Sequence, residues 1–338
     1  MIPLQLGLTT YAYHVAAGGG PRRLTANAPM TLEHFFRKTA ELGLPALHIS
    51  GESQLGSLEF ADVVKVRDRA ATFGLSLELG TGGTTPEHLQ SMIHVASILG
   101  SPVLRTVLGA RRPGSASELA EGLRKVSERL AEVLPTCERY QVGLAIENHQ
   151  DLTAAELHQI VAPFDSPWLG ICYDTGNQLA VLEDPVDALR RLAPYVLTVH
   201  LKDYQLVATP DGLALLSCPL GRGVVDLSRI FGLLAAAPRS PRLFLECALE
   251  RIEIPYLTEN FLSCCFDRSL LDLARTVRLV RDRGLPEGAD PLAGSEEEVL
   301  ARENDLVETS LSYALRLLGR PSAETDPSPE ALAEGEPC

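Results

Sequence analysis

Short apolar runs and longer amphipathic stretches alternate along this chain from residue 4 to residue 283. The apolar runs have the length of buried strands, and the stretches between them carry apolar residues with a helical period. This alternation predicts a parallel sheet, and eight strand–helix units favour its closure into a (β/α)8 TIM barrel. The predicted strands cover residues 4–10, 45–50, 76–80, 101–109, 142–149, 168–177, 196–203 and 242–250.

The pattern divides the chain into three parts. Residues 1–283 are predicted to form the barrel domain, and residues 284–320 an accessory C-terminal extension whose helix covers 295–318. The tail at 321–338 contains mostly Pro, Ser, Glu and Ala, so it is predicted to be disordered. Helices of the barrel are predicted at 31–43, 58–73, 86–99, 115–139, 153–164, 185–193 and 226–236, with Pro135 expected to kink or end the fourth.

The fifth predicted strand ends in three consecutive polar residues, Glu147, Asn148 and His149. A strand that is buried on both faces does not carry such residues without a reason. Because side chains alternate along a strand, Glu147 and His149 point to one side and Asn148 to the other. In α/β barrels the carboxyl ends of the strands carry the chemistry, so this strand end is a candidate functional site.

Polar side chains also end the next three predicted strands. Asp174, His200 and Glu246 stand at the tips of strands six to eight, as Glu147 does on strand five. In a closed barrel these tips converge at one rim. Each could be satisfied locally, but together three carboxylates and one imidazole form a donor set for one divalent cation. Mn²⁺ is the expected ion, with Mg²⁺, Co²⁺ and Zn²⁺ as alternatives.

The composition of the chain indicates which partners and which cellular location to expect. The net charge of −14 and the pI near 5.1 oppose a nucleic-acid partner, because phosphate binding needs clustered Lys and Arg. No apolar run reaches the roughly eighteen residues of a membrane span. The N-terminal stretch lacks the basic region of a signal peptide, and the seven cysteines form no CxxC pair. We therefore expect a cytoplasmic protein with reduced thiols.

Five motifs carry a resemblance to a known family: IENH at 146–149, YDTGN at 173–177, VHLKD at 199–203, PLGRGVVDLSRI at 219–230 and FLEC at 244–247. Over about residues 4–260 the chain resembles the sugar phosphate isomerase/epimerase family with a xylose isomerase-like TIM barrel. The resemblance implies one metal ion held by the four strand-end residues. It also implies that Glu147 and Glu246 form the catalytic acid–base pair, which moves a proton next to a carbonyl.

Further polar residues near the predicted strand ends are candidates for catalysis and substrate contact. His149, on the face of Glu147, is expected to assist as another proton carrier. A small sugar or sugar-derived molecule is the expected partner, with no nucleic acid and no membrane, and homo-oligomer formation stays open. The predicted substrate-binding residues are Arg105, Lys202, Arg222, His48 and Glu78, although solvated side chains are an equal alternative for Lys202 and Arg222.

The chain also departs from the family pattern, which leaves the reaction open. The TGNQ stretch at 175–178 stands where ketose epimerases carry a His, and CA at 247–248 replaces their usual Pro and aromatic residue. The expected function is a divalent-metal-dependent sugar isomerase or epimerase that works through an enediolate. The alternative is a lyase, decarboxylase or dehydratase acting on a keto-sugar or sugar acid. A nuclease for abasic DNA would need additional zinc-binding histidines, and a non-catalytic sugar-binding barrel would not need the four ligands.

Overall fold

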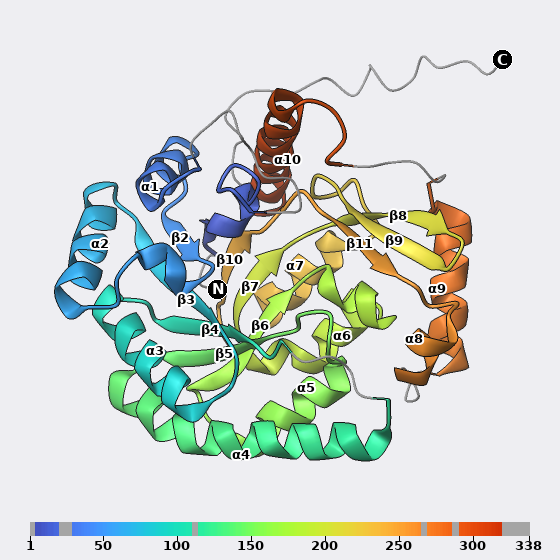
Figure 1. Ribbon diagram of the computed structural model, residues 1–338, viewed down its shortest axis with the longest axis horizontal. Helices are drawn as coiled ribbons and strands as arrows, with labels where there is room; N and C mark the ends of the chain where they lie inside the picture. Colours follow the sequence, from blue (N-terminus) through green and yellow to red (C-terminus); the bar gives the residue numbers. More distant parts are fainter. Residues whose placement is uncertain (1–3, 20–28, 110–113, 265–268, 286–290, 320–338) are drawn as a thin grey trace.

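Eight parallel strands of this chain close into a barrel (Figure 1). They are β1 (Leu6–Thr9), β2 (Ala46–Ile49), β3 (Ser76–Gly82), β4 (Val103–Val107), β5 (Gly143–Glu147), β6 (Leu169–Asp174), β7 (Val196–Leu201) and β10 (Arg242–Leu245). Their order around the barrel is β1-β10-β7-β6-β5-β4-β3-β2, which confirms the predicted TIM barrel. The structure is a computed structural model that describes residues 4–19, 29–109, 114–264, 269–285 and 291–319.

The barrel strands form where the sequence has apolar runs. Every residue of β1, β2, β5 and β6 is buried, because one face lines the barrel interior and the other meets the surrounding helices. Among the helices in the described ranges, none is long and apolar enough to cross a membrane. The helices around the barrel in Figure 1 are α1 (Leu32–Glu41), α2 (Phe60–Thr72), α3 (Pro86–Leu99), α4 (Ala116–Tyr140), α5 (Ala154–Val161), α6 (Pro185–Leu192) and α7 (Leu227–Ala236).

The helix α4 contains Pro135 in its interior and continues beyond it to Tyr140. The proline was expected either to kink the helix or to end it, and the structure shows that the helix does not end there. A proline inside a helix costs about 3 kcal/mol, because it removes one backbone hydrogen bond and its ring crowds the preceding turn. Val133 and Cys137 are buried on either side of the proline, so packing anchors both parts of the helix to the core.

The strand β3 is longer than the sequence predicted. It continues through the glycine-rich segment to Gly82, so Glu78 lies inside the barrel and the prediction that the strand ends there is wrong. A Cβ at Gly80 would lie 2.7 Å from the carbonyl oxygen of Ser50 and 2.9 Å from His48 Nε2. Glycine is therefore required here by close packing within the barrel, whereas the sequence pattern indicated a turn.

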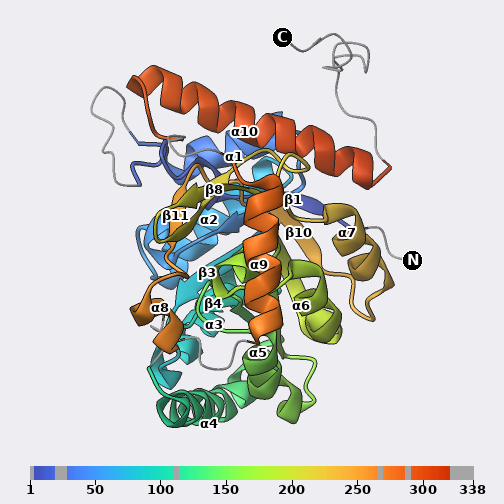
Figure 2. The ribbon, with the colours of Figure 1, turned by 90° about the vertical axis from the view of Figure 1, so that its right-hand side faces the viewer.

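A second sheet, which the sequence analysis did not predict, lies beside the barrel. The strands β8 (Tyr204–Thr209) and β9 (Gly212–Ser217) form an antiparallel hairpin, and β11 (Arg251–Ile254) pairs with β9. The short helix α8 (Glu259–Cys264) is followed by α9 (Leu270–Arg283), which packs against β8 (Figures 1 and 2). The segment between β10 and β11 therefore connects the barrel rim to this sheet.

The predicted C-terminal helix is α10 (Glu296–Leu317), which packs against the beginning of the chain (Figure 2). The buried Glu303 accepts hydrogen bonds from the backbone N–H groups of Val15 (2.8 Å) and Ala16 (3.0 Å). The proposed domain boundary at residue 283 stays a prediction, and the tail at 321–338 lies outside the described residues. The residues that α10 adds to the main hydrophobic core are Val299, Leu306, Val307, Leu311 and Ala314.

Candidate metal centre

The four predicted metal ligands meet at the carboxyl ends of four neighbouring strands. Glu147 is the last residue of β5, and Asp174 is the last residue of β6. His200 pairs in register with Asp174 from β7, and Glu246 directly follows β10. One oxygen or nitrogen atom of each side chain lies within 4.8 Å of the others, and all four residues are buried. These four residues are called the four-ligand cluster below.

Two atoms of the four-ligand cluster are buried without a hydrogen-bond partner, Asp174 Oδ2 and His200 Nδ1. The other oxygen of Asp174, Oδ1, accepts hydrogen bonds from the backbone N–H groups of Gly176 (2.8 Å) and Asn177 (3.1 Å). Asp174 Oδ2 lies 3.3 Å from Lys202 Nζ, and His200 Nδ1 lies 3.1 Å from Glu246 Oε2, so a bound cation would replace these ion-pair contacts. Carboxylate oxygens with one imidazole nitrogen suit a divalent cation, so the residues present fit the predicted metal.

Two asparagines contact members of the cluster, Asn148 through the backbone of Asp174 and Asn177 through the carboxylate of Glu147. Asn148 Nδ2 donates to the carbonyl oxygen of Asp174 at 2.9 Å, and Asn148 Oδ1 accepts from the N–H group of Asp174 at 2.6 Å. This pair of hydrogen bonds ties the ends of β5 and β6 together. Asn177 Nδ2 donates to Glu147 Oε1 at 3.3 Å. Hydrogen bonds of this kind orient ligating side chains before an ion binds.

Two basic side chains contact the carboxylates of the cluster. Arg105 Nε lies 3.1 Å from Glu147 Oε2, and its other nitrogens donate to two backbone carbonyl oxygens. Lys202 Nζ lies 3.1 Å from Glu246 Oε2 and 3.3 Å from Asp174 Oδ2. Both residues were predicted to bind substrate, and both also compensate negative charge on the predicted metal ligands.

This charge balance keeps the carboxylates ionised at neutral pH. Burial alone would raise the pKa of Glu147 and of Glu246, but the nearby basic side chains, His200 among them, hold both pKa values below their usual range. For Asp174, burial outweighs the attraction of Lys202 and raises the pKa to about 6. All three carboxylates therefore carry negative charge near pH 7, which metal binding requires.

His48 and Glu78, which the sequence placed at the substrate, lie deeper in the barrel and do not line the cavity beside the cluster. His48 Nδ1 lies 3.4 Å from His200 Nε2, with the two rings nearly perpendicular. Glu78 accepts a hydrogen bond from Thr198 Oγ1 at 2.9 Å, and burial raises its pKa to about 7. His48 thus contacts the far nitrogen of a predicted metal ligand.

A cavity of about 230 Å³ adjoins the four-ligand cluster. Its wall contains five of the residues selected from the sequence, namely Arg105, Glu147, His149, Lys202 and Glu246. Arg222, by contrast, is exposed in the loop after β9 and does not line this cavity. The cavity is small and largely polar in its lining, which suits a small hydroxylated molecule better than a macromolecule.

Among the residues of the site that were not selected from the sequence are Tyr11, Asn177 and Glu250. The Tyr11 ring centroid lies 5.6 Å from Lys202 Nζ. Glu250 Oε1 lies 3.7 Å from the same nitrogen and accepts a hydrogen bond from the Tyr204 hydroxyl at 2.6 Å. Tyr11 follows the first predicted strand and Glu250 ends the eighth, so the strand-end rule could have found both. Asn177 ends the sixth predicted strand, so the same rule could have found it, although in the structure it lies in the turn after β6.

The contact between His48 and His200 leads to a testable expectation. Replacing His48 by alanine should weaken divalent-metal binding by about 10–100-fold, because a ligating histidine is oriented by the partner of its other ring nitrogen. Calorimetric titration of Mn²⁺ into both proteins measures this change. A His94→Ala variant, altered at an exposed histidine of α3, serves as the control. An unchanged affinity in the His48 variant would contradict the orienting role.

The chain is similar in sequence to a described family and to two known proteins. Residues 82–259 match the family described as the xylose isomerase-like TIM barrel. The chain is 30% identical over 225 residues to 3-oxo-isoapionate decarboxylase of Pectobacterium atrosepticum, a match that covers 66% of this chain and 78% of that protein. It is 26% identical over 221 residues to the uncharacterized protein YihM of Escherichia coli, covering 65% of each.

Solved structures show the same fold at lower sequence identity. The D-psicose 3-epimerase of Clostridium cellulolyticum H10 has a TM-score of 0.60 and 14% identity, covering 91% of this chain and 98% of that one. The 3-keto-D-glucoside 4-epimerase of E. coli has a TM-score of 0.53 and 16% identity, covering 81% of this chain and 99% of that one. At these identities the similarity shows a shared fold and not a shared reaction.

Proposed function

The chain belongs to the family of xylose isomerase-like TIM barrels, and we propose that it is a divalent-metal-dependent enzyme that forms an enediolate from a small sugar-derived substrate. The observation that carries this proposal is the four-ligand cluster beside a small polar cavity. Within the cluster, the buried atoms Asp174 Oδ2 and His200 Nδ1 lie 3.3 Å from Lys202 Nζ and 3.1 Å from Glu246 Oε2, respectively. Mn²⁺ is the expected ion, with Mg²⁺, Co²⁺ and Zn²⁺ as alternatives. The finer assignment is a sugar isomerase or epimerase.

Proton transfer in this proposal falls to two glutamates. When bound, a divalent cation supplies positive charge that stabilises a developing enediolate. Glu147 ends β5 and Glu246 follows β10, with β6 and β7 between them, so their carboxylates approach the cavity from different sides. One glutamate, as the carboxylate, removes the proton next to the carbonyl, and the other, after taking up a proton from solvent, returns it to the opposite face of the carbon. His149, in the cavity wall, assists by carrying protons between this pair and solvent.

Arg105 and Lys202 complete the proposed machinery. The guanidinium of Arg105 is fixed by two backbone carbonyl oxygens, so it holds the carboxylate of Glu147 in one orientation. Lys202 lies in the cavity wall beside Glu246 and Glu250, where its ammonium group can donate to a substrate oxygen. A basic group next to the proton-transferring carboxylate also stabilises the negative charge that develops on the substrate.

A second candidate reaction is decarboxylation of a keto-sugar acid. The relative that favours it is the decarboxylase of P. atrosepticum, at 30% identity over 78% of its length. Loss of CO₂ from a carboxylate carried on the hydroxyl-bearing carbon next to the carbonyl leaves an enediolate of the same kind that proton removal gives. One protonation by Glu147 or Glu246 then completes the reaction, so the same residues serve both candidates. The two reactions differ in whether the carbon skeleton survives.

The product distinguishes the two candidates. The Mn²⁺-loaded protein is incubated in D₂O with ketoses, 3-keto-sugars and keto-sugar acids, and each mixture is followed by NMR and by CO₂ detection. An isomerase or epimerase incorporates one deuterium at carbon and keeps the skeleton, whereas a decarboxylase releases CO₂. Protein treated with EDTA is the control and should give neither signal. Absence of turnover with every substrate class would count against both candidates.

A further inference from the structure

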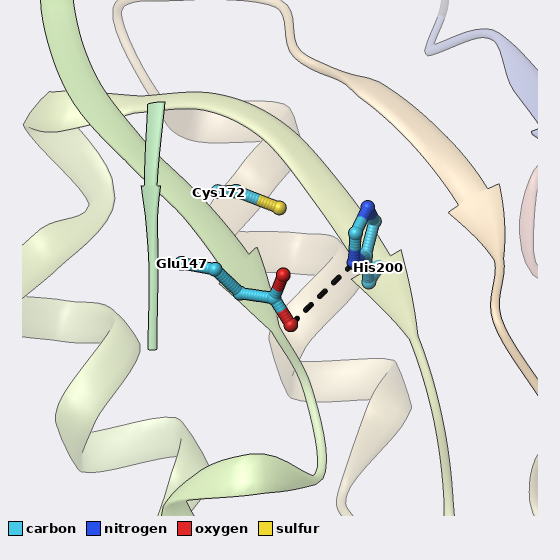
Figure 3. Close-up of side chains that lie close together, drawn as sticks. All are labelled: Glu147, Cys172 and His200. Atoms are coloured by element: carbon cyan, nitrogen blue, oxygen red, sulfur yellow. Dashed lines mark ion pairs between the residues drawn. The ribbon is translucent and has the colours of Figure 1, made fainter. Parts of the chain in front are cut away.

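A cysteine lies directly beside the four-ligand cluster. Cys172 precedes Asp174 by two residues on β6, so both side chains point into the barrel, with Cys172 about 6–7 Å deeper along the strand. Cys172 pairs in register with Glu147 of β5. Its sulfur, a carboxylate oxygen of Glu147 and a ring nitrogen of His200 all lie within 4.8 Å of one another. Figure 3 shows the thiol and the carboxylate side by side, both directed toward the imidazole.

The surroundings of Cys172 differ on its two sides. Below it, Val103 and Ala145 form a small apolar layer inside the barrel. Toward the cluster it meets Glu147, whose Oε1 lies 3.8 Å from His200 Nδ1, and that buried nitrogen also lies 3.1 Å from Glu246 Oε2. A buried cysteine usually acts as a small apolar side chain, as Cys137 does in the main core. Cys172 instead belongs, with Glu147 and His200, to a set of three possible metal ligands.

We propose that Cys172, Glu147 and His200 form an alternative binding position for soft divalent cations such as Zn²⁺ and Cd²⁺, deeper in the barrel than the four-ligand cluster. Thiolate sulfur selects such ions, whereas Mn²⁺ and Mg²⁺ prefer oxygen. One sulfur, one nitrogen and one oxygen donor leave a fourth tetrahedral position open. The thiol proton is released to solvent when the ion binds.

The donor atoms need little movement to bind such an ion. Zinc–ligand distances of about 2.0–2.3 Å place tetrahedral donor atoms about 3.3–3.8 Å apart. The three atoms of this set lie no more than 4.8 Å from one another, so side-chain rotation within the existing fold brings them into range. All three residues are buried, which excludes competing water from the site.

This position shares Glu147 and His200 with the four-ligand cluster, so the two positions cannot both be filled with complete ligand sets. A soft cation in the deeper position therefore displaces the ion of the four-ligand cluster. This consequence rests on the proposed function, because it assumes that the cluster holds the catalytic ion. The existence of the thiolate site does not rest on it.

Cadmium binding tests the thiolate site without any activity measurement. Cd²⁺ alone is titrated into the full-length protein, and the near-ultraviolet thiolate-to-cadmium charge-transfer band is recorded. The wild type should show a band component that Cys172→Ser lacks and that Cys137→Ser, altered at a buried cysteine of α4, retains. The difference between the bands of the wild type and of the Cys172 variant also removes the contribution of cadmium bound by the remaining cysteines. Cys172→Ala replaces Cys172→Ser if the serine variant does not fold.

Competition with manganese tests whether a soft cation in the deeper position displaces the ion of the four-ligand cluster. Free Mn²⁺ is followed by electron paramagnetic resonance while Cd²⁺ is added, and Cys172→Ser should require about tenfold more Cd²⁺ than the wild type for half-displacement. Equal charge-transfer bands in the wild type and in the Cys172 variant would overturn the thiolate site. Failure of the wild type to bind Mn²⁺ would instead count against the proposed function, while leaving the cadmium result intact.

Discussion

The Asp174→Ala variant is expected to lose its bound divalent metal and its catalytic activity together. Asp174 offers the cluster Oδ2, a buried oxygen that lies 3.3 Å from Lys202 Nζ. A bound cation contributes several kcal/mol of transition-state stabilisation, so its loss should lower the rate by about 10²-fold or more. Elemental analysis of the purified variant gives the metal content, and turnover of the substrate identified for the wild type gives the activity.

The Asp174→Asn variant tests whether metal is lost because a ligand is missing or because the turn after β6 is disturbed. Asparagine keeps an oxygen that can accept the hydrogen bonds from Gly176 and Asn177, but its amide nitrogen takes the place of Oδ2 and cannot bind a cation. Both variants should therefore lose the metal, while the asparagine variant keeps the thermal stability of the metal-free wild type. Full metal content in Asp174→Asn would show that this residue is not a ligand.

The four-ligand cluster could be anticipated from the sequence because each member stands out against its strand. A carboxylate or imidazole at the end of an apolar run has a high desolvation cost, and four of them on consecutive strands meet in any closed barrel. The barrel and the family were confirmed, and the structure brings Glu147, Asp174, His200 and Glu246 within bonding range of one ion. Their roles as ligands stay predictions.

The sequence could not predict how deep inside the barrel each polar side chain lies. Glu78, His48 and Arg105 look alike in the sequence, as single polar residues within apolar runs. Their positions depend on where each strand ends and on its register with its neighbours. Gly80 looked like the start of a turn, yet it continues β3, so Glu78 lies below the rim and only Arg105 reaches the cavity.

Contacts between side chains on different strands could not be predicted from the sequence either. Cys172 lies beside Glu147, and His48 lies beside His200, only because of the parallel register and the closure of the barrel. The antiparallel sheet of β8, β9 and β11 was missed because its apolar strands interrupt the strand–helix alternation that guided the assignment. That sheet matters for the site, since Tyr204 at the start of β8 holds Glu250 at the cavity.

The second large effect is expected at the two proposed proton-transferring glutamates. Glu246→Gln should lower the rate of proton exchange next to the carbonyl by about 10²–10⁴-fold, which is the usual contribution of a positioned acid or base. Glutamine keeps an oxygen that can contact a cation, so this variant should retain more metal than Asp174→Ala does. Glu250→Gln is the matched control, because Glu250 lines the same cavity and lies near Lys202 without belonging to the cluster.

The pattern of loss also distinguishes the two candidate reactions. In a two-base epimerisation each glutamate removes the proton of one epimer, so Glu246→Gln should stop deuterium exchange from one epimer and Glu147→Gln from the other. A decarboxylation needs only one proton donor after CO₂ has left, so only one of the two variants should alter the fate of the enediolate. NMR in D₂O with each pure epimer, or with the keto acid, measures both. If Glu246→Gln and Glu147→Gln both exchange at the rate of the Glu250→Gln control, neither glutamate transfers the proton and the mechanism is wrong, even if the metal remains bound.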